Sequence, residues 1–228
     1  MQTGVVKNCH DKMLFDVVNR FVGLSQEEKH IIDTVVEKAW ERCMYSFSHI
    51  NNIRYNTGGI QIYHICQYSM FLYFVANEIY RTYILGGADC TLARIVCDKI
   101  FMVNTAIAGA DIYYEQAMPD IFLLGHPGGI VFTPQATIGE YFFFMQGCNI
   151  GINNGKAPQL GRGVIMWGDS KIIGNCHVGN HVMFGANSYI KDMDVPDNSI
   201  VFGQYPNVII KENREDEIMS ILHERFIF

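Results

Sequence analysis

The chain has 228 residues, of which 49% are hydrophobic and 18% are charged, and its formal net charge is −6 at pH 7. This composition excludes a disordered tail and predicts a substantial core, organised as one domain or two small ones. Acidic and basic residues are interspersed without a basic stripe, which argues against a protein that follows nucleic-acid phosphates.

The seven cysteines contain no CxxC pair and no other metal-ligand spacing. Because their number is odd, free thiols in a reducing compartment are the simplest account. The N-terminal residues show no charged-then-apolar signal segment. We therefore expect a cytoplasmic protein. The cysteines are Cys9, Cys43, Cys66, Cys90, Cys97, Cys148 and Cys176.

Residues 1–110 are expected to form an α-helical region. Ser25 and Glu28 have the spacing of a capping box, and apolar residues follow at helical intervals, which predicts a helix over 25–48. A glycine pair at 58–59 marks a break, and a further helix is expected from about Cys90 to Val103.

Between the break and that last helix lies the most apolar segment, Ile60 to Leu85. It also carries polar and charged residues, which a bilayer-spanning helix accommodates only at high cost. A helix buried in the protein or facing a trimer partner is favoured over a transmembrane one, with contact at a membrane surface as the alternative. These polar residues are His64, Gln67, Asn77, Glu78 and Arg81.

Residues 111–211 show a six-residue period that fits neither a helix nor an ordinary strand. Such a period is typical of the hexapeptide repeat of a parallel β-helix, in which each rung adds one inward side chain to a shared core. Three rungs close one triangular coil, so about four coils are expected. The inward row is Ile138, Phe144, Ile150, Leu160, Met166, Ile172, Val178, Phe184, Ile190, Pro196 and Phe202.

Two interruptions of the period mark candidate functional segments. A ten-residue step ejects about four residues, Asn153–Lys156, as a loop, and loops on rigid scaffolds commonly carry function. The rung from Leu124 to Phe132 has eight residues and holds His126 among glycines and a proline, so its imidazole is expected to project from the coil. Residues 212–228 are expected to be a tail with a short helix over the open end of the solenoid.

Asp111-Ile112 is followed fifteen residues downstream by His126 and its Pro-Gly-Gly-Ile-Val sequence. With 136–140, 184–188 and 195–199, this spacing resembles the catalytic half of serine acetyltransferases and their relatives in the left-handed β-helix acyltransferase superfamily. The resemblance covers 111–209. It implies an α+β chain, with a helical region before a left-handed parallel β-helix, and an acetyltransferase that uses acetyl-CoA and no metal.

The chemistry suits the residue types at these positions. Acetyl transfer from a thioester needs a base to remove the acceptor's proton, and an imidazole titrates near neutral pH. The resemblance makes His126 this base and Asp111 the group that orients its ring, as the acid does in a triad. The alternatives are an exposed or structural histidine and an Asp111 that serves only the turn into the solenoid.

In such enzymes acetyl-CoA lies in the groove between neighbouring solenoids of a homotrimer, and two trimers can associate. By resemblance Gly168, Gly185 and Ala186 line the pantetheine path, and Lys191 or Lys211 meets the phosphates, although a glycine at a solenoid corner is more often structural. The candidates for contact with the acceptor are Gln146, Asn153 and Lys156.

The chain departs from the serine-specific pattern at two positions. Gly125 replaces an Asp before the catalytic His, and Ala157 replaces a second His after the ejected loop. Together with the neutral and aromatic residues at 141–146, this favours O-acetylation of a carbohydrate-like acceptor, as in polysaccharide biosynthesis, over free serine. Trp167, where relatives usually have glycine, either reshapes the cofactor groove or packs at the trimer seam.

Three alternatives remain. The chain can be a serine acetyltransferase that holds serine by other residues, or a noncatalytic solenoid scaffold. A metal-dependent solenoid is the least favoured, because His177 and His181 are four positions apart and so do not share a face of the β-helix.

Overall fold

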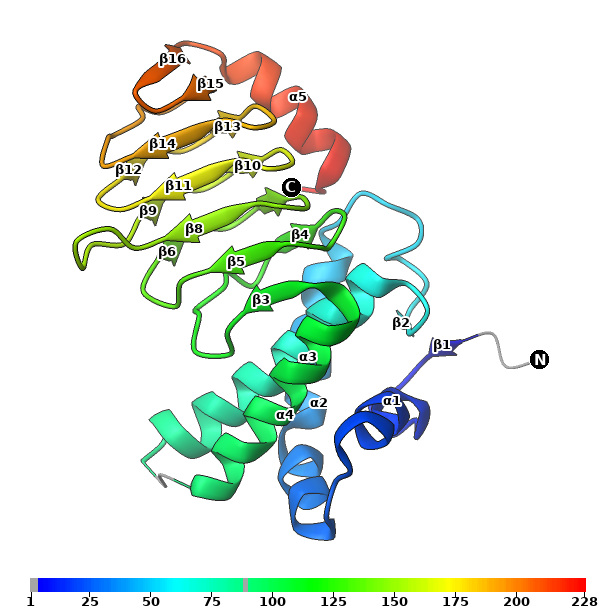
Figure 1. The fold of residues 1–228 in the computed structure, drawn as a ribbon. Coiled ribbons are helices and arrows are strands. Elements are labelled where there is room, and N and C mark those ends of the chain that lie inside the picture. Colours follow the sequence, from blue (N-terminus) through cyan, green and yellow to red (C-terminus); the bar gives the residue numbers. More distant parts are fainter. Residues whose placement is uncertain (1–3, 88–89) are drawn as a thin grey trace.

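The computed structural model describes residues 4–87 and 90–228. A bundle of helices leads into a stack of short parallel strands, and the last helix runs back along that stack (Figure 1). The elements before the stack are β1 (Val5–Val6), α1 (Met13–Val22), α2 (Gln26–Ser48), β2 (Ile60–Gln61), α3 (Ile65–Ile79), the π-helix η1 (Tyr80–Leu85) and α4 (Thr91–Ala108).

The predicted capping box begins α2. The hydroxyl of Ser25 accepts a hydrogen bond from the backbone N–H of Glu28 at 3.2 Å, and the Glu28 carboxylate accepts one from the backbone N–H of Ser25 at 2.7 Å. Lys99 on α4 donates to the same carboxylate at 2.6 Å. The cap therefore also fastens α2 to α4. Helix α1 was not predicted: it has no capping box, and its start is capped by Asp11, whose carboxylate accepts a hydrogen bond from the backbone N–H of Met13 at 3.1 Å.

Helix α3 is the centre of the helical bundle and lies between α2 and α4. Almost every residue of α3 is buried, as the sequence predicted. Its polar groups have partners: the Asn77 amide donates to the Tyr114 carbonyl at 2.8 Å, and Arg42 on α2 donates to Glu78 at 3.0 Å. No helix in the described part of the chain is both long and apolar enough to cross a bilayer.

The solenoid has three faces of parallel strands; two faces carry five strands each, and the third carries three strands from the middle coils. Paired in order, β3, β5, β8, β11 and β14 form the first face, β4, β7, β10, β13 and β15 the second, and β6, β9 and β12 the third. This makes about five turns, one more than expected, because the coil of β3 and β4 precedes the in-phase row. The strands are β3 (Ala110–Ile112), β4 (Phe122–Leu124), β5 (Ile130–Phe132), β6 (Thr137–Ile138), β7 (Phe142–Phe144), β8 (Asn149–Gly151), β9 (Gln159–Leu160), β10 (Ile165–Met166), β11 (Lys171–Ile173), β12 (His177–Val178), β13 (Met183–Phe184), β14 (Tyr189–Lys191), β15 (Ile200–Gln204) and β16 (Asn207–Lys211).

The inward row is confirmed from Phe144 to Ile190, where every member is buried. At the last turn the prediction is wrong by one residue. Val195 pairs with Val178 and is buried, whereas Pro196 is exposed, and Val201 rather than Phe202 lies against Phe184. The step after Ile190 is five residues, because the turn before Val195 is one residue shorter than the others.

Helix α5 (Glu215–Arg225) lies along the flank of the solenoid rather than over its open end (Figure 1). Its Ile218 and Leu222 are fully buried, as are Ile165 and Ile200 on the second face. At the open end β16 pairs antiparallel with β15 instead. The last residues of α5 then reach the helical region, where the carbonyl of Arg225 accepts a hydrogen bond from the backbone N–H of Asn51 at 2.8 Å.

Candidate functional site

One corner of the solenoid stacks equivalent turns above the His126 segment. The backbone N–H of Gly147 donates to the carbonyl of Gly128 at 2.8 Å, and that of Asp169 donates to Gln146 at 2.9 Å. Asn187 continues the ladder at the next coil with a bond of 2.9 Å to Gly168. These hydrogen bonds hold each turn over the one below, so a residue in any of them has a defined position relative to His126.

His126 is exposed in the turn between β4 and β5 and opens onto a cavity of about 520 Å³. Three parts of the chain form this cavity: the second face of the solenoid, the segments that precede and begin α3, and the end of α5. The lining residues are Asn51, Asn52, Arg54, Tyr55, Tyr63, His64, Ile65, Cys66, Leu123, Leu124, Gly125, His126, Pro127, Phe143, Met145, Trp167, Glu224 and Arg225.

Asp111 reaches the same corner from β3, which pairs with β5 directly after the His126 turn. Residue Gly109, just before β3, lies so close to that turn that a Cβ there would be 3.1 Å from the Gly128 Cα. Partial burial raises the pKa of the Asp111 carboxyl. Among the described residues, no hydrogen bond or ion pair joins Asp111 to His126. Asp111 is paired with Val131 of β5 and does not line the cavity that His126 faces, so the single chain does not join the two side chains.

Four of the other candidate residues lie at this corner. Gln146 is in the turn one coil above His126, Gly168 is in the next, and Gly185 and Ala186 are in the one after that. A Cβ at Gly168 would lie 2.5 Å from the Gln146 side-chain nitrogen, so a larger residue there would displace the Gln146 amide. The Gln146 side-chain oxygen is buried without a hydrogen-bond partner in the described part of the chain.

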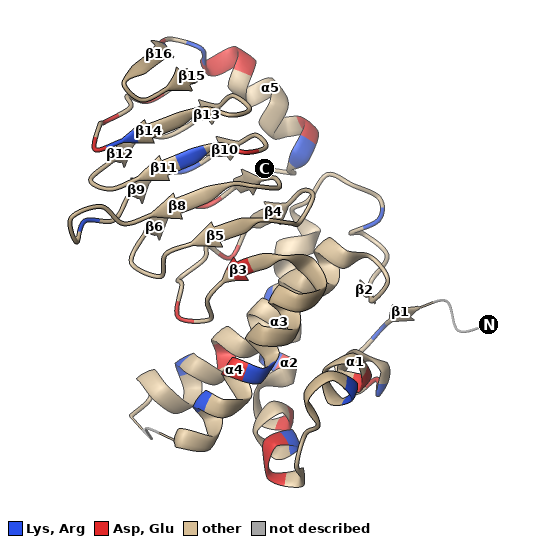
Figure 2. Cartoon of the chain, in the orientation of Figure 1, with Lys and Arg blue, Asp and Glu red and all other residues tan. Residues whose placement is uncertain are grey.

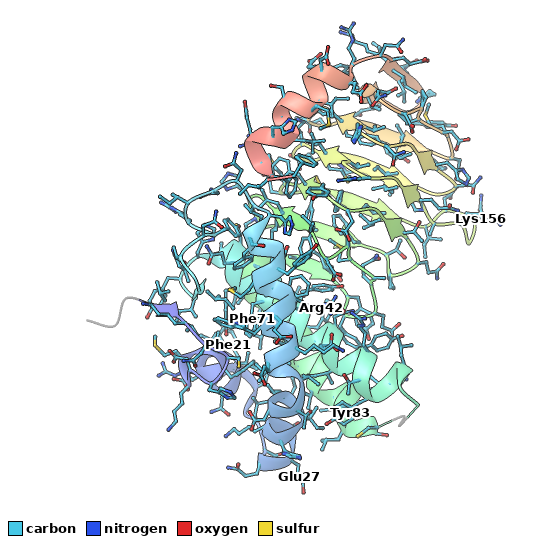
Figure 3. All side chains as sticks on the ribbon, turned by 180° about the vertical axis from the view of Figure 1, so that it is seen from behind. Phe21, Glu27, Arg42, Phe71, Tyr83 and Lys156 are labelled. Atoms are coloured by element: carbon cyan, nitrogen blue, oxygen red, sulfur yellow. The ribbon has the colours of Figure 1, made fainter. Side chains whose placement is uncertain are left out.

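The remaining candidates lie elsewhere. Asn153 and Lys156 follow β8, and Lys191 ends β14, so all three are at the far ends of the strands that begin near His126. The amide of Asn153 is held by Asp192, whereas Lys156 projects from its loop at the edge of the solenoid (Figure 3). Lys211 on β16 stands over the ring of Phe202, 5.2 Å from its centroid. Within one chain these side chains do not reach His126.

Sequence reasoning missed the part of the cavity that the helical region forms. The Cys66 thiol donates to the carbonyl of Gly125 at 2.7 Å, and burial raises its pKa to about 11, so the group is a protonated donor at neutral pH. Burial, followed by the charge of Arg54, lowers the pKa of His64. No sequence motif marks these residues, because only folding brings them beside the His126 turn.

The aromatic residues at 141–146 do not form one acceptor surface. Phe142 points into the solenoid core and is fully buried, and Tyr141 stacks on Phe228 at 4.4 Å between ring centroids. Only Phe143 of this run of aromatic residues faces the cavity, where its ring meets that of Trp167 edge to face at 5.5 Å. Trp167 therefore lines the cavity beside His126.

The other histidines outside this corner do not gather ligands. His177 pairs with Asp194 at 3.0 Å, and the pKa of that carboxyl is lowered mainly by a hydrogen bond from the backbone N–H of His177 and then by its ring. In the described ranges, no three side chains among His, Cys, Asp and Glu come together in an arrangement that could hold a metal ion.

Comparison with solved structures defines the class. The fold matches the crystal structure of serine acetyltransferase from Brucella abortus with a TM-score of 0.68, at 17% identity, over 87% of this chain and 82% of that one. A serine acetyltransferase in complex with CoA matches with a TM-score of 0.65, at 17% identity, over 90% of this chain and 86% of the other. The molecule is thus a hexapeptide-repeat β-helix protein with an N-terminal helical region, as the sequence predicted.

Sequence comparison adds the family. The chain is 28% identical over 123 residues to serine acetyltransferase 2 of Arabidopsis thaliana, a match that covers 52% of this chain and 38% of the relative. The chain thus spans less than half the length of that relative. No protein-family model matches. In sequence and in fold the chain is thus similar to serine acetyltransferases of the hexapeptide-repeat type.

Proposed function

We propose that the protein is an O-acetyltransferase that transfers the acetyl group of acetyl-CoA to an acceptor hydroxyl at His126. The observation that carries the proposal is the exposure of His126 at a cavity of about 520 Å³, at the position where the sequence resembles the catalytic segment of serine acetyltransferases. The relatives and the CoA complex support the choice of donor.

The reaction needs one proton to be moved twice. His126 removes the hydroxyl proton as the acceptor oxygen attacks the thioester carbonyl and forms a tetrahedral oxyanion. The oxyanion collapses, the carbon–sulfur bond breaks, and the imidazolium returns the proton to the leaving thiolate. Asp111 accepts a hydrogen bond from the other ring nitrogen and stabilises the imidazolium.

The donor lies along the corner that carries Gly168, Gly185 and Ala186, whose turns stack directly above His126. Asn153, Lys156 and Lys191 contribute from the neighbouring copy of a homotrimer, because in one chain they occupy another corner. Lys191 or Lys211 neutralises the phosphates of CoA. The seven free cysteines fit a reducing compartment, and we place the enzyme in the cytoplasm.

Serine is the first acceptor to test, because the relatives are serine acetyltransferases. The sequence favoured a carbohydrate-like acceptor, and one observation keeps that candidate. The chain lacks the carboxylate that serine-specific enzymes carry before the catalytic His, and a Cβ at Gly125 would lie 3.0 Å from Met145 and 3.1 Å from Phe143, so a side chain there would have to displace these neighbours by a few tenths of an ångström. A carbohydrate hydroxyl requires no such group.

Release of CoA thiol from acetyl-CoA tests both acceptors. The purified protein is assayed with L-serine and with a panel of sugars and UDP-sugars. Acceptor-dependent thiol release with one of them supports the proposal and identifies the acceptor class. Absence of acetyl-CoA binding in calorimetry would instead indicate a noncatalytic scaffold.

A further inference from the structure

The guanidinium of Arg225 lines the cavity beside His126. The guanidinium carbon of Arg225 lies 5.5 Å from the ring centroid of Phe143 and 5.9 Å from that of Trp167. Its Nε is buried and has no hydrogen-bond partner among the described residues. Its one ion pair, to Glu224, is long at 4.0 Å. The residue therefore keeps hydrogen-bonding capacity next to the proposed catalytic base.

The backbone around Arg225 is held by hydrogen bonds, although the Nε of its side chain has no partner among the described residues. Its carbonyl accepts a hydrogen bond from Asn51, and two further bonds, from the Asn51 amide to His223 and from Ile227 to His49, tie the same segment to the helical region. The backbone that carries Arg225 is therefore fixed, and the rings of Phe143 and Trp167 confine its guanidinium.

The charges that line the cavity favour an anion. Among its lining residues are two guanidiniums, those of Arg54 and Arg225, and one carboxylate, that of Glu224. Two imidazoles can add hydrogen-bond donors. The side chain of Arg54 is exposed and forms no hydrogen bond or ion pair within the described ranges. Figure 2 shows charges of both signs at the end of α5, where it meets the helical region. Paired guanidiniums bind carboxylate or phosphate in preference to neutral groups.

From this arrangement we infer that Arg225, assisted by Arg54, binds an anionic group of the acceptor while the acceptor hydroxyl faces His126. The inference rests on the proposed acetyl transfer for the role of that hydroxyl. The anionic group is a carboxylate in an amino acid or a phosphate in a nucleotide-sugar. Arg225 is in this sense a specificity residue, supplied by the C-terminal helix and not by the hexapeptide repeat.

Binding is measured without catalysis, through the fluorescence of Trp167. The chain has two tryptophans, so Trp40→Phe leaves Trp167, which touches Arg225, as the reporter. Two acid–neutral pairs serve as probes: L-serine against L-serinamide, and a UDP-sugar against the free sugar. We expect one acid to bind more tightly than its neutral partner, which identifies the source of the anion.

Substitutions then assign the preference to the cavity. Arg225→Gln and Arg54→Gln should each raise the Kd of the acid about tenfold and leave that of the neutral partner unchanged. Glu224→Gln should lower the Kd of the acid, because a competing carboxylate is removed. Arg162→Gln is the matched control: Arg162 also covers an aromatic ring, that of Tyr141, but lies outside the cavity and should change nothing. Melting curves of each variant verify folding, and Arg54 is exposed enough to be replaced without unfolding.

Equal loss of acid and neutral ligand in Arg225→Gln, an unchanged preference in both arginine variants, or no binding of either acid to the parent protein overturns the inference. The outcomes are separable from those of the proposed function. If thiol release fails with every acceptor while the charge-dependent binding persists, the acetyl transfer is wrong and the anion site stands. If transfer proceeds with equal KM for acid and neutral acceptors, the reverse holds.

Discussion

The solenoid and the helical region contribute to the site in different ways. In the solenoid each turn bonds to the next, so His126 and the turns above it are positioned by contacts between coils that follow one another in sequence. The helical wall of the cavity depends on contacts between remote segments, such as that between Asn51 and Arg225. The comparison teaches that the repeat supplies the proposed chemistry, whereas the non-repetitive parts shape what the chemistry acts on.

The sharpest way to test the chemical half of this comparison is His126→Ala. We expect turnover to fall about 10²- to 10⁴-fold, the usual contribution of a general base. Because His126 is exposed, the melting temperature and acetyl-CoA affinity should not change. Steady-state kinetics and calorimetry measure these quantities. His177→Ala, an exposed histidine on the third face, is the control, and near-parental activity of His126→Ala would reject the base assignment.

The structural half is tested in the core column. Phe184 is fully buried between Met166 and Val201, so Phe184→Ala should cost about 3–5 kcal/mol in the free energy of unfolding. Phe202 is 38% exposed because of the five-residue step, and Phe202→Ala should cost less than about 1 kcal/mol. Denaturant titrations compare the two variants. Equal losses would mean that the in-phase row continues to Phe202.

Asp111→Asn probes the boundary between the two regions. We expect turnover to fall on the order of tenfold, about 1.4 kcal/mol of barrier, because the imidazolium loses its orienting carboxylate. Stability should move the other way. Burial raises the pKa of Asp111, so ionisation of its carboxyl lowers the free energy of unfolding as the pH rises above the ordinary value of 3.8. Asp111→Asn should therefore raise the free energy of unfolding at pH 7 and leave it unchanged in acid, where the carboxyl is protonated in both states. Melting curves of Asp111→Asn recorded against pH measure this gain. The gain together with an unchanged turnover rate would assign Asp111 to structure alone.

The smallest expected effect concerns the helical region. Glu28 caps α2, and its hydrogen bond with Lys99 is the main cause that lowers its pKa. Because its pKa is lowered, ionised Glu28 stabilises the fold at pH values above the ordinary pKa of 4.5. This stabilisation is lost as the pH falls through the pKa of the folded state. Glu28→Gln should cost about 1 kcal/mol at pH 7 and nothing in strong acid. The exposed Glu27→Gln is the control in urea titrations.

The two regions also differ in how far the sequence predicted them. The six-residue period located the faces of the solenoid and the His126 turn, because each rung obeys one local rule of burial. The five-residue step from Ile190 to Val195 was missed, because a turn shortened by one residue has no distinctive residue types in the sequence. In the helical region the capping box located α2, but α1 lacks such a signal and was overlooked.

The same reasoning explains which site residues were foreseen. Gly168 and Ala186 were named from the family resemblance, and the structure stacks their turns above that of His126 because the coils repeat; their roles stay predictions. Arg54 and Arg225 reach the cavity only through tertiary packing, and isolated arginines carry no spacing that a single sequence can reveal. Helix α5 likewise buries its Ile218 and Leu222 through tertiary packing, and its own sequence does not show which surface they meet.

The bond between Asn51 and Arg225 has a consequence for biosynthesis. Ribosomes make the first wall of the cavity early, then all coils of the solenoid, and only afterwards Glu224 and Arg225. A nascent chain released before that point has His126 but lacks part of its enclosure. The inferred anion site can therefore form only after the last helix has been made, when every coil of the solenoid has already been synthesised.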